Sequence, residues 1–194
     1  MSLDYEVRLV ERRDIQAFVE ENHYSGSING CIADYCFGLF DGEVMVGAMF
    51  YGRMAMRNQY KRFAQEEKDV TELRRLCCID NTPRNTESYF IGWTLRWLAK
   101  NTGIKVVVSY ADKEHGHRGV IYQASNFKLE GERPGARVID FEGKTYHDKA
   151  IRTKYNGELK PFAQRLKLAL EEGRATYRNT AGKICYTYEL RRRR

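Results

Sequence analysis

The 194-residue sequence contains no long apolar run, which excludes a helix that spans a membrane. Its first residues, MSLDYEVRLVERRD, also lack the apolar core of a secretory signal. We therefore expect no membrane partner and a cytoplasmic protein. Internal repeats, linkers and low-complexity segments are absent too, apart from the terminal arginines. A chain of this length is expected to form one domain over residues 1–194, with a short basic tail at 191–194.

The sequence also lacks a CxxC pair, and its five cysteines are an odd number. Such a set is a poor disulfide framework, so most cysteines are expected to be reduced core residues. The adjacent Cys77 and Cys78 end a predicted strand, where side chains alternate between faces. At most one of the pair should face the interior, and the other could line the site. A catalytic cysteine is not favoured, because nothing near the pair forms a clear activating partner.

Positive charge is in excess, with 33 Lys and Arg against 26 Asp and Glu and a formal net charge of +7. This balance suits a polyanionic partner. The basic residues cluster at Arg53, Arg57, Lys61 and Arg62, at Lys144, His147, Lys149, Arg152 and Lys154, and at Arg191–Arg194. We assign contacts with nucleic acid to Lys144, Lys149, Arg152 and Lys154. The alternative is that these runs are merely solvated, which is the commoner case for basic segments.

Hydrophobic periodicity predicts strands and helices in mixed order, which is typical of an α/β (α+β) fold. The expected strands are Tyr5–Val10, a hairpin of Ala33–Phe40 and Val44–Tyr51, then Val70–Ile79, Lys105–Ser109, Phe127–Glu130, Arg137–Phe141 and Ile184–Leu190. The expected helices are one capped by Asp14, one capped by Thr86 or Ser88, a short one near His117–Ser125 and one opened by Pro161. In the short helix, the spacing predicts that Val120, Ile121 and Ala124 share a face from which Tyr122 points away.

The stretch Lys105–Gly131 is the first candidate for a site, because Asp112 stands where a buried strand ends. In α/β sheets, ligands bind at the carboxyl ends of strands. Asp112 could act as a general base, a metal ligand or an acceptor that orients a substrate amine, or it could simply cap the next helix. Tyr122 could bond to or stack on a base, or it could pack in the core.

Motifs in three parts of the chain resemble the phage Mom family of DNA-modification enzymes, whose fold is related to GNAT-type acyltransferases. The matching residues lie in the same order as in the family and span about residues 20–131. They are Asn22–Gly26, Glu72–Cys77 with Asn85 and Ser88–Ile91, and Ser109–Asp112 with Gly116, His117, Gly119, Ile121–Ala124, Asn126, Phe127 and Gly131. The resemblance implies a GNAT-like mixed central sheet of about six to seven strands flanked by helices.

The family's function implies an enzyme that adds a carbamoylmethyl (acetamido) group to adenine N6 in double-stranded DNA, which protects phage DNA from restriction in the bacterial host. The family's site residues fall on His23, Tyr24, Arg74, Ser88, Asp112 and Tyr122. The resemblance also implies iron (Fe²⁺), held by His23 and Asp112 with His115 or His117. Simpler roles exist for three of these residues: a histidine favourable to a helix dipole, a salt bridge by Arg74 and a helix cap by Ser88.

One segment departs from the acyltransferase pattern. GNAT enzymes place a glycine-containing RxxGxG/A loop after the fourth strand, where backbone amides hold a pyrophosphate. Here Thr82–Ser88 contains no glycine, and Glu87 would repel phosphates. Acetyl-CoA is therefore not the expected donor, and the group donor is open. The alternatives are a GNAT-type N-acetyltransferase acting on a small amine or protein and a non-catalytic DNA-binding protein. The oligomeric state is also open, with a homodimer among the possibilities.

Overall fold

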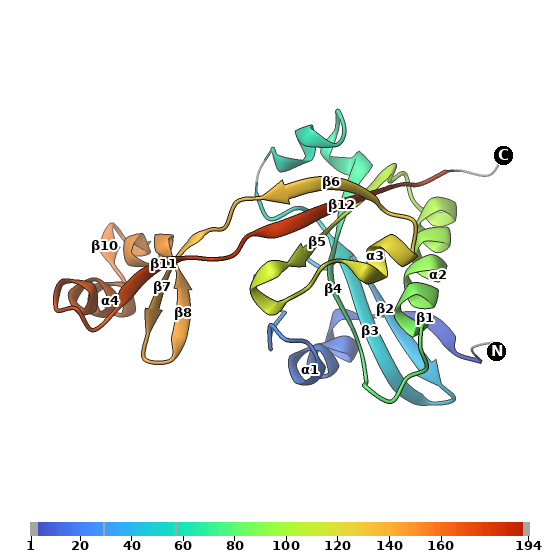
Figure 1. The fold of residues 1–194 in the computed structure, drawn as a ribbon, viewed down its shortest axis with the longest axis horizontal. Helices are drawn as coiled ribbons and strands as arrows, with labels where there is room; N and C mark the ends of the chain where they lie inside the picture. The colour runs from blue at the N-terminus through green and yellow to red at the C-terminus, as the bar shows by residue number, and fades with distance from the viewer. Residues whose placement is uncertain (1–3, 29, 57, 192–194) are drawn as a thin grey trace. The chain divides into compact units, whose positions relative to one another are not determined.

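The structure is a computed structural model that describes residues 4–28, 30–56 and 58–191. Arg57 and Arg192–Arg194 of the predicted basic groups lie outside the described residues. A seven-stranded mixed sheet confirms the expected α/β fold (Figure 1). In spatial order its strands are β1 (Glu6–Val10), β2 (Tyr35–Asp41), β3 (Val44–Gly52), β4 (Val70–Cys78), β5 (Val106–Asp112), β12 (Lys183–Glu189) and β6 (Lys128–Arg133). Strands β1 to β4 pair antiparallel, whereas β4 and β5 pair in parallel.

The remaining elements include four α-helices among the described residues. These are α1 (Arg12–Asn22), α2 (Thr86–Asn101), α3 (Val120–Ala124) and α4 (Pro161–Glu171). Short 3₁₀ turns are η1 (Gln59–Arg62), η2 (Glu67–Asp69), η3 (Lys113–His115) and η4 (Asp148–Arg152). A second sheet contains β11 (Thr176–Asn179), β7 (Arg137–Phe141) and β8 (Lys144–His147), and β9 (Lys154–Tyr155) pairs with β10 (Glu158–Leu159). No described helix has the length and apolar character to cross a membrane.

The helix starts differ from those predicted. Glu11 occupies the N-cap of α1, and Asp14 lies in the first turn, where its carboxylate accepts the Glu11 N–H at 2.8 Å. The N-cap of α2 is Asn85, which adopts a left-handed φ of 73°. The predicted caps Thr86 and Ser88 therefore fall inside the helix. In both cases the capping prediction was displaced by a few residues, because it identified a polar side chain near the start without the backbone geometry that defines the cap.

The chain divides into two compact units. Unit 1 contains residues 1–111, 117–131 and 184–194, and unit 2 contains 112–116 and 132–183. The backbone passes between the units at four places, so neither unit is one continuous segment. The expectation of a single domain stays a prediction.

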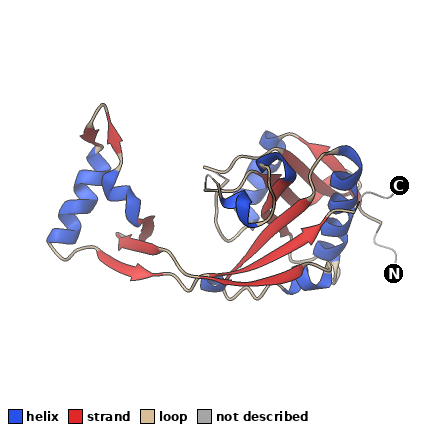
Figure 2. Cartoon of the chain, turned by 90° about the horizontal axis from the view of Figure 1, so that it is seen from above, coloured by secondary structure: helices blue, strands red, loops and turns tan. Residues whose placement is uncertain are grey.

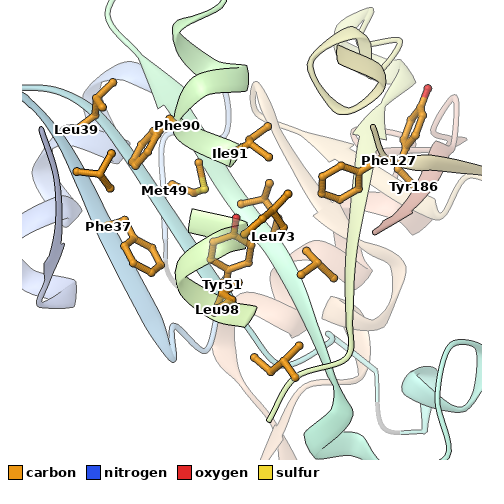
Figure 3. Packing of buried hydrophobic residues seen from close by; sticks show 14 of the residues in the cluster. Phe37, Leu39, Met49, Tyr51, Leu73, Phe90, Ile91, Leu98, Phe127 and Tyr186 are labelled. Atoms are coloured by element: carbon orange, nitrogen blue, oxygen red, sulfur yellow. The ribbon is translucent and has the colours of Figure 1, made fainter. Parts of the chain in front are cut away.

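Alternation along the strands of unit 1 places hydrophobic clusters on both faces of the sheet. On one face, Phe37, Met49 and Tyr51 pack against residues of α2 that include Phe90 and Ile91 (Figure 3). The other face is covered by α1, whose side chains contact the intervening strand positions; this group includes Ile15, Val19, Cys36, Ala48 and Phe50. Unit 2 has its own small core, formed by Ile139, Phe141, Leu166, Ala169 and Ala175.

Candidate active site

Strand β4 contains a β-bulge at Arg74. Opposite β3, Arg75 pairs with Phe50 and Leu73 pairs with Tyr51, so Arg74 has no partner position. The parallel pairing with β5 ends beside it, at Leu73 and Ser109, although both strands continue. A bulge re-aims the side chains around it and interrupts pairing, and such irregularities are frequent next to active sites. This point of the sheet therefore defines the candidate site in unit 1.

The Arg74 guanidinium is held in place by three groups. It donates to a carboxylate oxygen of Glu72 at 3.3 Å, to the Arg53 carbonyl at 3.2 Å and to the Cys31 sulfur at 3.4 Å. Only 10% of the Arg74 side chain is exposed. Its Nε is buried and has no hydrogen-bond partner among the described residues. Arg74 thus forms the salt bridge expected as its simpler role, and it still has one donor to offer a carbonyl or an anion.

Helix α1 ends at Asn22, and the turn that follows it, which contains His23, contacts strand β4 through Ser25. The backbone N–H of Ser25 donates to His23 Nδ1 at 3.0 Å, and Ser25 Oγ lies 2.9 Å from the same nitrogen. Arg75 Nε donates to Ser25 Oγ at 3.0 Å, which ties this turn to β4. Because a backbone N–H can only donate, Nδ1 is an acceptor and the neutral imidazole carries its proton on Nε2.

Tyr24 forms an aromatic group with two imidazoles. Its ring centroid lies 4.2 Å from that of His23 and 5.0 Å from that of His117, both tilted. The side chain of Tyr24 is 48% exposed, so part of this surface is open to a ligand. Aromatic faces of this kind stack on nucleobases. His117, predicted only as an alternative metal ligand, therefore belongs to a stacking surface.

Tyr122 points into the core, and the predicted orientation of α3 was wrong. Val120 is 69% exposed and Ala124 is exposed, whereas Ile121 and Tyr122 pack against the main core. The helix has only five residues, so helical spacing could not define a face. Gly119 precedes it with φ 72°, and a Cβ there would lie 2.3 Å from the Tyr186 ring. This close approach, which only glycine allows, sets the position of α3.

The Tyr122 hydroxyl is a hydrogen-bond donor at neutral pH. Burial raises its pKa to about 12, although the hydrogen bond with Ser109 lowers it, and nearby Tyr24 and Glu72 raise it further. Burial raises this pKa because it disfavours the charged phenolate. Tyr122 can thus orient a ligand but cannot serve as a base.

The simpler role considered for both Asp112 and Ser88 was that of a helix cap. Asp112 takes this role, and Ser88 does so only in part, since it bonds within the first turn of its helix. Asp112 caps η3 by accepting the Glu114 N–H at 3.0 Å, and its other carboxylate oxygen lies 3.3 Å from Lys183 Nζ. Ser88 donates to the Asn85 carbonyl at 2.9 Å within the first turn of α2. By compact unit, Asp112 belongs to unit 2, whereas the other five predicted site residues belong to unit 1.

The described residues do not fit an iron site. No group of three or more His, Cys, Asp or Glu side chains among them is arranged to hold a metal ion. His23 Nδ1 is already an acceptor for Ser25, and Asp112 is engaged by Glu114 and Lys183. The two imidazoles and one carboxylate of a facial iron site are therefore not assembled, and we derive no step through iron.

Burial favours the thiol form at three of the five cysteines. All five are free. Cys77 and Cys78 alternate between faces as predicted, but each packs in a hydrophobic core, so the expectation that at most one of them faces the interior was wrong. Burial raises the pKa of Cys36 to about 11 and that of Cys77 to about 12, and it also raises the pKa of Cys78. A nucleophilic thiolate is disfavoured at these three positions.

Four basic residues assigned to nucleic acid lie on the surface of unit 2. Lys144 is in β8, Lys149 and Arg152 are in η4, and Lys154 is in β9; all four are exposed. A single carboxylate organises this segment, since Asp148 lies 3.6 Å from Arg137, 2.7 Å from His147 and 3.8 Å from Arg152. Of the four assigned cations, Asp148 therefore contacts Arg152.

The sequence did not predict a role for two residues of the site, Ser25 and Arg75. Both lie inside motifs that carried the family resemblance, but spacing alone gave neither a role. Nothing in the residue order indicates that β4 has a bulge at Arg74. The contact of Arg75 with Ser25 joins positions 50 residues apart in the chain.

Comparison with solved structures identifies the fold as that of the GNAT acetyltransferases. An acetyltransferase of the GNAT family from Streptococcus pneumoniae superposes with a TM-score of 0.54 and 10% sequence identity, covering 97% of this chain and 100% of that one. Arabidopsis thaliana NAA60 in complex with acetyl-CoA gives 0.57 and 9%, covering 96% and 98%. At these identities the likeness establishes the fold alone.

The chain belongs to the Mom protein family, whose family model matches residues 4–194. A relative in this family is the methylcarbamoylase mom of Escherichia phage Mu, which is 30% identical over 137 residues. The aligned region covers 69% of this chain and 56% of the relative, so the chain matches a little over half of that protein's length. The predicted family and GNAT-like fold are thereby confirmed.

Proposed function

We propose that the chain is a transferase that adds a carbamoylmethyl (acetamido) group to N6 of adenine in double-stranded DNA and so protects phage DNA from restriction. The observation that carries this proposal is the match to the Mom family over residues 4–194. The name of the phage Mu relative, a methylcarbamoylase, supports the type of group transferred. The excess of positive charge supports a polyanionic substrate.

The reaction makes two physical demands on the protein. The adenine amine is a weak nucleophile, because its lone pair is delocalised into the ring, and in the duplex it is paired. The base must therefore leave the stack, and a proton must leave N6 when the new N–C bond forms. A site for this reaction needs an aromatic surface for the extruded base, donors that orient it and a proton acceptor.

The described residues offer these groups. The half-exposed Tyr24, beside His117, supplies the surface on which the extruded adenine stacks. Tyr122 donates a hydrogen bond to the base from its phenol, which is protonated at neutral pH. Asp112 accepts the N6 proton or orients the amine. Its carboxylate is only 17% exposed, and binding of the substrate must compete with its contact to Lys183.

His23 and Arg74 act on the transferred group in this proposal. The contact with Ser25 leaves Nε2–H of neutral His23 as a donor. The buried Nε of Arg74 has no partner among the described residues, so a carbonyl oxygen of the donor molecule would satisfy it. Ser88, in the first turn of α2, would contact the same molecule. The basic residues of unit 2 would contact DNA phosphates.

Analysis of nucleosides from cells that produce the protein tests the proposal. DNA from cells with the wild-type chain should contain deoxyadenosine altered at N6, detected by mass spectrometry, and Asp112→Asn at equal soluble level should abolish it. Endonucleases that read adenine in the major groove should also cut this DNA less well, because the substituent projects there.

Unmodified nucleosides together with normal cutting would reject the proposal, provided that the host supplies the donor. Repeating the assay in phage-infected cells controls for the donor. Modification at a base other than adenine would leave a DNA-modifying enzyme but reject the N6 assignment.

The alternative function is N-acetyltransfer to a small amine or protein, which the fold favours. The start of α2 is the feature that opposes it. Residues 82–88 contain no glycine, and the Thr86 and Ser88 hydroxyls donate to carbonyls of their own turn at 2.6 and 2.9 Å. Glu87 adds a negative charge in the first turn. Calorimetry with acetyl-CoA separates the two functions, since tight binding would favour the acetyltransferase.

A further inference from the structure

The hairpin formed by β9 and β10 is a narrow, fixed projection of unit 2. Tyr155 pairs with Glu158 across a turn of two residues, Asn156 and Gly157. Both turn residues have positive φ, 50° and 85°, as in the type I′ turns that favour Asn-Gly and join antiparallel strands tightly. In Figure 2 this hairpin stands beyond α4 at the end of the unit. The turn geometry therefore fixes which side chains reach the tip.

The base of the hairpin is attached to α4. The Lys160 N–H donates to the Thr153 carbonyl at 2.9 Å, which closes the hairpin below its strands. Gln164 of α4 donates to the Leu159 carbonyl at 3.0 Å. Helix α4 begins directly afterwards at Pro161 and packs on the small core of unit 2. The hairpin is thus held at its base by the helix.

The tip combines an aromatic ring with positive charge. Tyr155 is 70% exposed, the largest exposed fraction among the large hydrophobic side chains that the structure describes. Exposed Lys154 precedes it, and exposed Lys149 and Arg152 lie in η4 just before the hairpin. Glu158, the cross-strand partner of Tyr155, is also exposed. An exposed ring next to Lys154, in a segment with two further cations, matches a partner that offers both phosphates and flat bases.

We propose that the β9–β10 hairpin is a wedge, with Tyr155 entering a base step of duplex DNA while Lys149 and Lys154 contact the flanking phosphates. This inference rests on the proposed function, because it takes DNA as the substrate. Aromatic and apolar wedges unstack base steps, and the energy spent is recovered in wider contact with the bent duplex. Unstacking a step also lowers the cost of extruding a base, which the proposed reaction requires.

The test uses the full chain and a duplex that carries 2-aminopurine, whose fluorescence rises when it is unstacked. Wild-type protein should raise the fluorescence on binding. Tyr155→Ala should weaken binding by about 5- to 150-fold, the range for loss of one stacked base, and should remove the fluorescence rise. The salt dependence of binding should not change, because a neutral side chain releases no counterions. Tyr155→Phe should retain both the affinity for the duplex and the fluorescence rise.

The matched control is Tyr177→Ala, another exposed tyrosine of unit 2, whose ring is already covered by the Arg137 guanidinium at 4.6 Å. Its affinity should change less than about 2-fold. Wild-type affinity and fluorescence in Tyr155→Ala would overturn the wedge, as would equal Tyr155-dependent binding to polyglutamate, which would indicate an acidic protein partner. If cells contain modified adenine but the fluorescence rise is the same in Tyr155→Ala, only the wedge is rejected. If the fluorescence rise depends on Tyr155 but the cells contain no modified nucleoside, only the proposed function is rejected.

Discussion

The backbone N–H of Ser25 lies 3.0 Å from Nδ1 of His23 and fixes the role of that imidazole. A backbone amide cannot accept a hydrogen bond, so Nδ1 accepts and the proton of the neutral ring resides on Nε2. In neutral His23, Nε2 is therefore a hydrogen-bond donor. For Nε2 to bind a metal or act as a base, the proton would have to move to Nδ1, and the hydrogen bond from Ser25 would break.

The first prediction concerns this tautomer. Nitrogen NMR at a pH where His23 is neutral should show an unprotonated Nδ1 and a protonated Nε2. Ser25→Ala retains the backbone donor, so it should preserve the tautomer while removing the hydrogen bond from Arg75. A proton on Nδ1 in the wild-type protein would contradict the geometry and would restore His23 as a candidate metal ligand.

The second prediction concerns the Tyr122 hydroxyl. Tyr122→Phe keeps the ring in the core but removes the hydrogen bond with Ser109, so unfolding free energy should fall by only about 0.5–1.5 kcal/mol. DNA modification should be lost, because the phenol is the proposed donor to the base. Tyr188→Phe, in a tyrosine packed on Phe127 of the same core, is the control and should retain activity. Full activity in Tyr122→Phe would give Tyr122 a packing role alone.

Gly119 provides the third prediction, on stability. A side chain at φ 72° is strained, and its Cβ would meet the Tyr186 ring at 2.3 Å. Gly119→Ala should therefore lower the unfolding free energy by about 1–3 kcal/mol in urea titrations and displace α3, which carries Tyr122. Gly143→Ala is a matched control, since that glycine also has positive φ but no atom within 4 Å of its Cβ. Equal losses would mean that strain alone matters at Gly119.

The fourth prediction is that stability declines in alkali. The pKa values of Cys36, Cys77 and Tyr122 are raised by burial to about 11, 12 and 12, from ordinary values of 9 and 10. The contribution of these protonated groups to the unfolding free energy is fully present below pH 9. Above it the unfolded chain loses protons that the folded chain keeps, so unfolding free energy should fall as pH rises from about 9 to 12.

Chemical denaturation at several pH values measures this decline. Tyr122→Phe should reduce the slope between pH 10 and 12, where the unfolded tyrosine titrates and the folded one does not. A flat profile over the whole range would mean that these groups are as accessible to ionisation in the folded protein as in the unfolded chain.

The fifth prediction separates the basic segments. Replacing Lys149, Arg152 and Lys154 by glutamine should weaken duplex binding to a similar degree for all sequences and flatten its salt dependence, by a slope of about 0.9 for each phosphate that is no longer neutralised. Deleting residues 191–194 should have the smaller effect. Filter binding at several salt concentrations distinguishes the two. An unchanged slope in the triple variant would assign these charges to solubility.

Much of the fold was predictable from the sequence. Alternation located the hairpin strands β2 and β3 and strand β4, and helical spacing located helix α2. These elements are long enough for the apolar pattern to recur several times within each of them. The short α3 was misread, since five residues do not define a face and its orientation depends on the contact of Gly119 with Tyr186. Helix caps were displaced because they depend on backbone dihedrals that a residue order does not contain.

The sequence by itself determined the family, through motifs that name His23, Tyr24, Arg74 and Tyr122 as candidates, and it determined the excess of positive charge. Only the tertiary structure decided what those residues do together. The register of β4 at its bulge, the contact of Arg75 with Ser25 and the tilted ring contact of His117 with Tyr24 join residues that lie far apart in the chain. Such contacts follow from how strands pair and where pairing fails. Local preference carries little information about either, because it acts over a few neighbouring residues.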